Sequence, residues 1–277
     1  MGDLFMNENN ENESELSELD QINSLRAKDT NFVFLFGKAA VGKTAIIASI
    51  FHFLNTECQL GYLEQISSLN NNVNENGRNL GEIIKQNISI GRFPDRTGIG
   101  NLFGIDTCFI SSRIRPNLNP LRLTFLDMPG EDLHQVSIGQ QGKFPKNIDV
   151  FFKAGKLSMT FILVTSYDEA QKDDLLMVNF LDYIYKKSPR FRESRVLLLI
   201  SKWDKYSKRM NDSDFIQNQM PQTFRKLSRE TNSYGTFSLG MVIEEVDELP
   251  FIQEYNGRSA ERVFSWIYQT LTEKKFK

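Results

Sequence analysis

The stretch NFVFLFGKAAVGKT, residues 31–44, joins a short apolar run to a loop that contains two glycines. Residues 32–36 are continuously apolar over the length of a strand, as in a parallel strand buried on both faces. Residues 37–44 fit the pattern G-x-x-x-x-G-K-[ST], and residues 44–54 read as the helix that should follow it. Glycine permits backbone angles that turn successive N–H groups inward as an anion-binding nest, and the helix N-terminus adds its positive dipole end. The stretch therefore predicts a site for a nucleoside triphosphate.

The loop also predicts which groups contact the phosphates. Lys43 should reach the β- and γ-phosphates, and the Thr44 hydroxyl should hold Mg²⁺. Nucleotide contacts are expected over one continuous run: Gly37, Lys38, Ala39, Ala40, Val41, Gly42, Lys43, Thr44 and Ala45. The pattern indicates a triphosphate but not the base attached to it. A chance match in a glycine-containing turn is the alternative.

Beyond this stretch, strand-like and helix-like segments alternate. Strands are expected at residues 106–115, 121–126, 158–165, 195–201 and 237–243, and helices at residues 168–187, 212–230 and 259–275. The first of these strands alternates apolar and polar residues and suits an antiparallel or edge strand. Alternating elements predict a three-layer α/β fold, in which a mostly parallel, twisted sheet carries helices on both faces.

Two stretches depart from this alternation. Residues 1–30 are rich in Asn and Glu, and eight acidic against two basic residues give them a charge of −6. We expect an acidic tail that is either disordered or docked, on a partner or on the body, through a weak apolar stripe in residues 16–25. Residues 57–104 hold an Asn-rich loop and a short helix near residues 80–88, and are expected to be an insertion. No linker divides the remainder, so residues 31–277 are predicted to form one domain.

The composition narrows the function classes. The net charge is −2 over 277 residues, so no nucleic-acid partner is expected. Two Cys and two His argue against a disulfide framework and against a zinc site. No apolar run is long enough for a transmembrane segment, and the N-terminus lacks the features of a signal peptide, so a cytoplasmic location is expected.

A second motif, Asp127-Met128-Pro129-Gly130, follows the strand predicted at residues 121–126. An acidic residue at the carboxyl end of a strand lies beside the phosphate loop in an open parallel sheet, so Asp127 can hold Mg²⁺ through a water. The Gly130 N–H can meet a γ-phosphate, because no Cβ blocks a close approach. A contact made only to the γ-phosphate orders a loop in one nucleotide state and releases it in the other. A plain strand-ending turn is the alternative.

A third motif, Ser201-Lys202-Trp203-Asp204, follows the strand predicted at residues 195–201. A carboxylate at Asp204 can accept two hydrogen bonds from guanine, whereas adenine offers neither donor there and would leave the carboxylate unpaired. The aliphatic stem of Lys202 would cover one face of the base. An exposed turn after the strand is the alternative.

These three motifs, in this order and at strand ends, resemble the signature motifs of the translation-factor and Ras-like (TRAFAC) class of P-loop GTPases. The resemblance covers about residues 31–277. Within that class, the chain looks closest to bacterial Ras-like GTPases with enlarged switch regions, of the double-GTPase kind found in multi-protein conflict systems. The resemblance implies a Ras-like G domain with GTP/GDP and Mg²⁺ as ligands, and residues 57–104 as an enlarged switch I insertion.

The chain departs from the family pattern at the base. Ser201 stands where the family usually has Asn or Thr, although a serine can still make the hydrogen bond that braces the phosphate loop. The last base-contacting loop of the family, usually Ser-Ala-Lys, has no clear match. Ser238-Leu239-Gly240 is the candidate, and Ser259-Ala260, just before the final predicted helix, is the alternative.

The resemblance also implies roles in the switch regions. Switch I should supply a Thr for Mg²⁺ and the γ-phosphate, and Thr97 fits better than Thr107, which falls inside a predicted strand. Ras-like members carry a Gln directly after the switch II glycine, where this chain has Glu131. Glu131 could orient or deprotonate the attacking water, but its charge would face a polyanion, so slow, partner-assisted hydrolysis is expected. Arg96, or alternatively Arg92, could act as an arginine finger in cis.

The leading interpretation is a GTP-binding molecular switch that hydrolyses GTP slowly to GDP and phosphate. Its switch loops would gate a protein partner. A P-loop ATPase or small-molecule kinase is the alternative, since it shares Lys43, Thr44 and Asp127 but does not need the motif at residues 201–204. A scaffold that binds GTP and barely hydrolyses it is a third interpretation.

Overall fold

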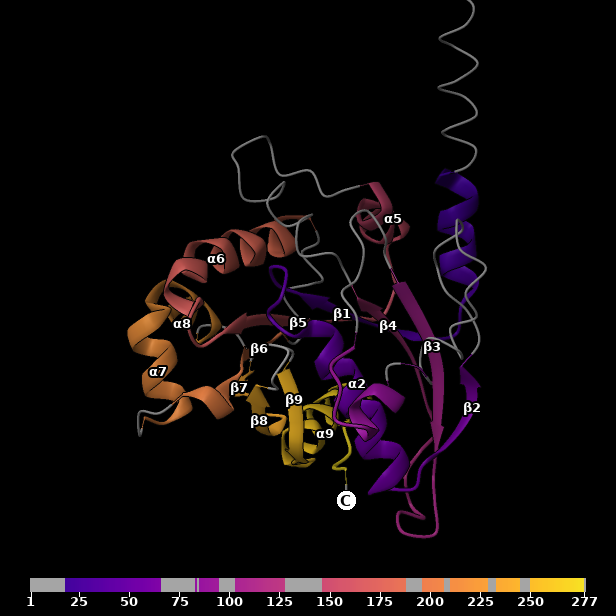
Figure 1. Cartoon of the computed structure of the whole chain (residues 1–277). Helices are drawn as coiled ribbons and strands as arrows, with labels where there is room; N and C mark the ends of the chain where they lie inside the picture. The colour runs from indigo at the N-terminus through magenta and orange to yellow at the C-terminus, as the bar shows by residue number, and fades with distance from the viewer. Residues whose placement is uncertain are drawn as a thin grey trace, which may run out of the picture.

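β1 (Asn31–Phe36) lies inside the central sheet because side chains cover both of its faces. Its even-numbered phenylalanines pack into one apolar cluster, whereas Val33 and Leu35 pack into another. The computed structural model describes residues 18–65, 83, 85–94, 103–127, 146–187, 196–206, 210–228, 233–244 and 250–276. In that part of the chain the central sheet has seven strands, in the order β2-β3-β4-β1-β5-β6-β7 (Figure 1).

Four neighbouring pairs in this sheet are parallel. β4 and β5 flank β1, β6 pairs with β5, and β7 pairs with β6, all in parallel register. β3 pairs antiparallel with β4, and β2 pairs antiparallel with β3. The bounds are β2 (Gly61–Gln65), β3 (Phe103–Ile110), β4 (Leu121–Asp127), β5 (Met159–Ser166), β6 (Val196–Ser201) and β7 (Ser233–Thr236). The mostly parallel sheet predicted from the sequence is confirmed, and β3 is antiparallel as expected, although it lies inside the sheet and ends at Ile110.

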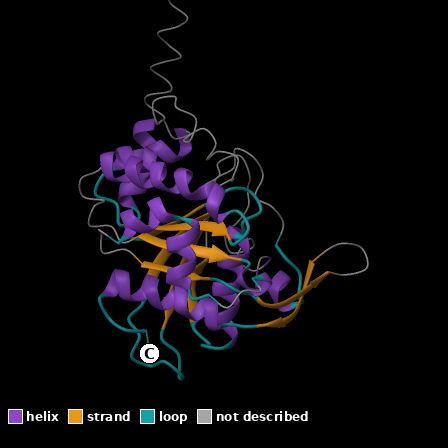
Figure 2. Ribbon diagram, turned by 90° about the vertical axis from the view of Figure 1, so that its left-hand side faces the viewer, coloured by secondary structure: helices purple, strands orange, loops and turns teal. Residues whose placement is uncertain are grey.

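Helices cover both faces of the sheet, which completes the three predicted layers (Figure 2). α2 and α9 pack against the face that includes Val33, and α5, α6 and α7 pack against the face that includes Phe34. Aromatic rings fill the second interface. The rings of Phe34 and Phe151 of α5 meet edge-on with their centroids 5.1 Å apart, and the ring centroids of Phe36 and Phe180 of α6 lie 4.1 Å apart. The bounds are α2 (Lys43–Thr56), α5 (Lys146–Ala154), α6 (Ala170–Lys187), α7 (Asp212–Gln219), α8 (Pro221–Leu227) and α9 (Arg258–Thr272).

The single helix predicted at residues 212–230 is wrong, because the chain forms α7 and α8 there. Pro221 lacks an N–H group, so it cannot continue α7 but fits the first turn of a new helix. Met220 cannot cap that helix with its side chain. Asp174 of α6 does so instead, since its carboxylate accepts the backbone N–H groups of Gln222 (3.1 Å) and Thr223 (2.8 Å).

The last strand, predicted at residues 237–243, is also misplaced. β7 ends at Thr236, and β8 (Gly240–Glu244) pairs antiparallel with β9 (Pro250–Tyr255) in a separate two-stranded sheet. Gly240 makes this change of direction with a φ of 115°, and a Cβ there would lie 2.0 Å from the carbonyl oxygen of Glu254. Only glycine fits both conditions.

Most of the predicted insertion at residues 57–104 lies outside the described residues. Its described part contains β2, which the sequence did not indicate, and a helical stretch at residues 85–89. The chain then reaches the small sheet: the Ile252 N–H donates to the Gly91 carbonyl (2.7 Å), and Arg92 forms an antiparallel bridge with Phe251.

Residues 18–27 are helical and pack on the body (indigo in Figure 1). Ile22 and Leu25 are buried in the same apolar cluster as α5. Arg26 Nε donates to the Ala154 carbonyl (2.7 Å), and Lys153 Nζ lies 2.5 Å from a Glu18 carboxylate oxygen. Within the described ranges, no helix combines the length and the apolar character that crossing a bilayer requires.

Candidate functional site

The loop at residues 37–42 leaves the carboxyl end of β1 and leads into α2, and its two glycines serve different purposes. A Cβ on Gly37 would lie 2.2 Å from the Val164 carbonyl oxygen of β5, so this glycine is required by a close approach of two strands. Gly42 has a φ of 91°, and a Cβ there would have no atom within 4 Å, so it is required by the backbone angle alone. The sequence-based expectation of special angles therefore holds for Gly42 and not for Gly37. Ala40 also has a left-handed φ, 62°.

Lys43 begins α2 and turns its side chain back across this loop. Its Nζ donates to the carbonyls of Gly37 (2.8 Å) and Lys38 (3.0 Å), and the residue is only 7% exposed. A buried ammonium group at the mouth of a loop that ends in a helix N-terminus favours an anionic ligand. The structure thus places the cation where the sequence expected the phosphates.

Thr44 and Asp127 come together from different elements. The Thr44 hydroxyl donates to Asp127 Oδ2 at 2.5 Å, and Asp127 ends β4 with 3% of its surface exposed. The parallel register of β4 with β1 pairs Asp127 with Leu35, two residues before the loop. A hydroxyl and a carboxylate are the hard oxygen donors that Mg²⁺ prefers. Among the described residues no three acidic, His or Cys side chains form a metal-binding cluster.

Ser201 joins the third motif to the phosphate loop. Its buried hydroxyl lies 2.7 Å from the Val41 carbonyl and 3.1 Å from the Thr165 carbonyl, and donates to these acceptors. The hydrogen bond that the sequence expected from Asn, Thr or Ser at this position is therefore present. Lys202 has a φ of 55° and leads into a 3₁₀ turn, η3 (Trp203–Lys205), on which Asp204 is exposed.

Asp168, which the sequence did not single out, lies in the turn after β5 near Lys202. Burial opposes the charged form of Asp168, but hydrogen bonds to its carboxylate and the positive charge of Lys202 outweigh burial and lower its pKa below the usual value. Asp168 is therefore ionised at neutral pH beside the lysine that is expected to cover the base.

The two candidates for the last base-contacting loop lie against each other. The Ser238 N–H donates to the Ser259 hydroxyl at 3.1 Å, and the preceding Phe237 carbonyl accepts the Trp203 N–H at 3.1 Å. Leu239 is buried next to them. The described structure therefore brings Ser238 and Leu239 beside the turn that carries Asp204, with Ser259 directly behind them.

Four sequence-predicted residues lie outside the described residues. They are Arg96, Thr97, Gly130 and Glu131. Arg92, the alternative to Arg96, is described: it is exposed, and its backbone pairs with Phe251 of β9.

The sequence missed one strong contact of the loop. Lys38 Nζ lies 2.5 Å from Asp173 Oδ1, and the other oxygen of Asp173 accepts the Thr165 hydroxyl at 2.6 Å. Asp173 lies on α6 between Ala170 and Met177, which are both buried. A carboxylate on the apolar face of a helix was the available signal, because such a charge is rarely buried without a partner.

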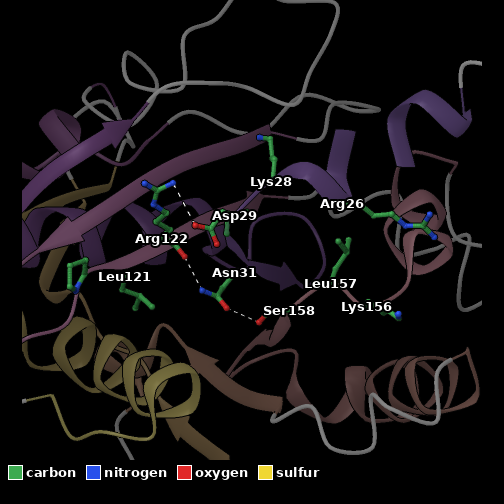
Figure 3. A pocket seen from close by; sticks show the side chains of 11 residues that line it. Arg26, Lys28, Asp29, Asn31, Leu121, Arg122, Lys156, Leu157 and Ser158 are labelled. Atoms are coloured by element: carbon green, nitrogen blue, oxygen red, sulfur yellow. Dashed lines mark hydrogen bonds and ion pairs between the residues drawn. The ribbon is translucent and has the colours of Figure 1, made fainter. Parts of the chain in front are cut away.

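A hollow of about 480 Å³ lies at the end of the sheet opposite the phosphate loop, where β1, β4 and β5 begin (Figure 3). Its charged groups do not converge on a common point. Lys28 Nζ lies 2.6 Å from Asp106, Arg26 binds the Ala154 carbonyl, and Arg122 faces Asp29 at 3.8 Å.

Comparisons with known proteins give distant structural likenesses. No protein-family model and no curated protein matches the chain. The solved structure of Methanosarcina barkeri Roco2 RocCORdC bound to GDP is 15% identical with a TM-score of 0.38, covering 89% of this chain and 49% of that one. The chain thus spans about half of that protein's length.

Two further solved structures are similar over most of this chain. The signal recognition particle receptor SRb-GTP/SRX complex from Chaetomium thermophilum is 13% identical with a TM-score of 0.46, and covers 87% of this chain and 99% of that one. A dimerization-deficient mutant of Toc33 from Arabidopsis thaliana is 12% identical with a TM-score of 0.39, and covers 93% and 92%. No comparison supports the closer likeness to the double-GTPase families.

Because these likenesses are distant, the fold is assigned from the molecule itself. The sheet order, the antiparallel β3 beside parallel β4 and β1, and the loop between β1 and α2 are observed directly. The chain has a three-layer α/β fold with a mostly parallel sheet, and a glycine-containing loop joins its central strand β1 to α2.

Proposed function

We propose that this chain is a GTP-binding molecular switch that hydrolyses GTP slowly to GDP and phosphate. The observation that carries the proposal is the contact of the Ser201 hydroxyl with the Val41 carbonyl. It links the segment that carries Asp204 to the loop that carries Lys43. A phosphate cradle and a carboxylate able to select guanine are thereby held by one buried hydrogen bond.

On the phosphate side, the proposal is supported by the contacts of Lys43 with the loop carbonyls and of Thr44 with Asp127. The Lys43 ammonium would exchange backbone carbonyls for phosphate oxygens, which carry full charge and bind it more strongly. Thr44 and Asp127 would hold Mg²⁺, with Thr97 as a further ligand from switch I. When bound, the ion neutralises charge on the phosphate oxygens.

For hydrolysis, we propose that Glu131 orients or deprotonates the attacking water and that Arg96 stabilises charge in cis. A carboxylate facing a polyanion is a poor water-positioning group, which supports a slow intrinsic rate. Glu131→Gln should then preserve or raise the single-turnover rate. A large drop would show that Glu131 acts as the base, and an unchanged rate in Arg96→Ala would remove the arginine finger.

As a switch, the chain would read the γ-phosphate through Gly130 and Thr97. Loss of that phosphate would release residues 57–104 and 131–156 and change affinity for a protein partner. In this proposal residues 31–277 are the GTP-binding domain, and the acidic segment before them is a docking element whose helix at residues 18–27 packs on that domain.

The deciding experiment is nucleotide binding by wild type and Asp204→Asn, with the identity of any co-purified nucleotide found by mass analysis. We expect GTP and GDP to bind in preference to ATP, and Asp204→Asn to weaken GDP binding by about 100-fold, because a charged acceptor of two hydrogen bonds is lost. Asp29→Asn is the control, since Asp29 is 93% exposed and lies at the other end of the sheet.

Each of the other possible results would favour a different function. A preference for ATP, or an Asp204→Asn variant that behaves like the Asp29→Asn control, would remove the GTPase and favour the ATPase or kinase alternative. Tight GTP binding with no hydrolysis, alone or with cellular partners, would favour the scaffold.

A further inference from the structure

A buried ion pair holds the first residue after Gly37. Lys38 Nζ lies 2.5 Å from Asp173 Oδ1, and the Asp173 side chain has no exposed surface, whereas that of Lys38 is 27% exposed. A buried carboxylate is costly unless it is paired and hydrogen-bonded. Asp173 meets both conditions, since its second oxygen accepts the Thr165 hydroxyl at 2.6 Å.

This pair belongs to a continuous set of contacts beneath the loop. Thr165, which binds Asp173 with its hydroxyl, also accepts the Ser201 hydroxyl with its carbonyl. Ser201 in turn donates to Val41. The loop is therefore attached at Lys38 to α6, which Asp173 joins to Thr165 of β5, and at Val41 to Ser201 of β6. These two attachments lie on both sides of Ala39 and Ala40.

The order of an anion-binding loop decides its affinity. Backbone N–H groups that converge on an anion repel one another while the site is empty, so an unsupported loop would disperse and binding would have to order it again. The pairing has a second effect: Lys38 neutralises a carboxylate that would otherwise oppose a polyphosphate.

We propose that Asp173 is a positioning residue that, through Lys38, holds the phosphate loop in its binding conformation before the nucleotide arrives. The inference deepens the proposed function and rests on it for the identity of the ligand. Because Asp173 acts on contacts that GDP and GTP share, its loss should weaken both equally and leave hydrolysis at saturating GTP nearly unchanged.

The test compares Asp173→Asn with Asp174→Asn in the full chain. Asp174 is the adjacent residue and is also buried, but it caps α8 and binds Gln222 and Thr223 rather than the loop. We expect Asp173→Asn to raise the Kd for GDP and for GTP about tenfold, with kcat changed by less than about twofold. Asp174→Asn should lower thermal stability with little change in either Kd, and Asp173→Glu should recover part of the affinity.

Amide hydrogen exchange of residues 38–44 in the nucleotide-free protein gives a second measurement. Exchange there should be faster in Asp173→Asn and unchanged in Asp174→Asn. If Asp173→Asn does not fold, Thr165→Val removes the other hydrogen bond to Asp173 with little change of shape, and should raise the same Kd values and exchange rates to a smaller extent.

Equal Kd values and equal exchange in the two aspartate variants, with both less stable than wild type, would overturn the proposal and leave the ion pair a structural contact only. Failure of the proposed function is recognised separately. If the wild type binds ATP or pyrophosphate but not GTP, the guanine assignment falls, while the Kd for those ligands and the exchange rates still decide the role of Asp173.

Discussion

Lys43 rests its ammonium group on two neutral carbonyls in a site with 7% exposure. A buried ammonium group beside the N-terminus of a helix favours a negatively charged ligand, so this end of the loop suits an anion. At the same scale, Gly37 and Gly42 show that one sequence pattern can satisfy two unrelated physical demands. One glycine admits a neighbouring strand, and the other admits a left-handed backbone angle.

Replacing Lys43 by Ala should abolish triphosphate binding, with a loss of affinity of about 1,000-fold or more, because Lys43 is the one buried lysine or arginine among the described residues. Stability of the nucleotide-free protein should also fall, because the hydrogen bonds from Lys43 to the Gly37 and Lys38 carbonyls are lost. Calorimetric titration with GDP and a thermal melt would measure both quantities. Retention of affinity within about tenfold would contradict the role of Lys43.

The two glycines should respond differently to Ala. Gly42→Ala places a Cβ in open space at φ 91°, so it should cost about 1–2 kcal/mol of unfolding free energy through backbone strain. Gly37→Ala should cost more, because its Cβ would meet a β5 carbonyl oxygen at 2.2 Å and the strands would have to separate. Urea unfolding of both variants would measure the difference, and a reversed order would show that the loop relaxes around Gly37.

At the scale of elements, the sequence predicted those strands whose formation depends on their own residues. β1, β5 and β6 were predictable because uninterrupted apolar runs suit strands buried on both faces. The break between α7 and α8 depends on Pro221 and on a cap that Asp174 supplies from α6. The spacing of apolar residues along α7 and α8 carries no sign of that distant cap. β8 and β9 depend on each other for pairing, so the sequence of either strand alone could not locate them.

The candidate site also has parts that could be predicted from the sequence and parts that could not. The three motifs were predictable because each lies where a strand ends, and parallel strands bring those ends together. The Lys38–Asp173 pair was not predictable, because it joins a loop to a helix far along the chain. Lys38 occupies a variable position of the loop pattern, and Asp173 belongs to no motif. The roles of Arg96, Thr97, Gly130 and Glu131 stay predictions.

The helix at residues 18–27 should contribute to stability through its buried side. Leu25→Ala removes a side chain that is 5% exposed and should cost about 2–5 kcal/mol if the helix unfolds with the body. Leu19 is 55% exposed on the same helix, so Leu19→Ala is the matched control and should change little. Equal midpoints of denaturation for the two variants would mean that this helix opens independently of the rest.

At the scale of the whole molecule, the site draws on the carboxyl ends of β1, β4, β5 and β6. Lys43, Asp127, Thr165 and Ser201 come from or follow these strands. A ligand that contacts this edge is therefore bound only by the folded sheet, and its binding adds to the free energy of unfolding.

Mg²⁺ with GDP at about 100 times its Kd should stabilise the chain by about 2.7 kcal/mol and raise Tm by several degrees. Removal of Mg²⁺ with a chelator should reduce the shift, because Thr44 and Asp127 then have no ion to hold against the phosphates. A thermal melt of the wild type and of Lys43→Ala would check this. A similar shift in the variant would place the ligand elsewhere.

The small sheet of β8 and β9 also joins segments that are far apart in the sequence. β9 receives the chain at Gly91 and Arg92, and Asn256, just past its end, donates its N–H to the Leu239 carbonyl at 2.9 Å. The segment at residues 91 and 92 and the segment at Leu239 are thus both hydrogen-bonded to β9 or to the residue that follows it. Residues 91 and 92 cannot move away from β9 without breaking the hydrogen bond from the Ile252 N–H to the Gly91 carbonyl, so β9 couples their position to that of Leu239.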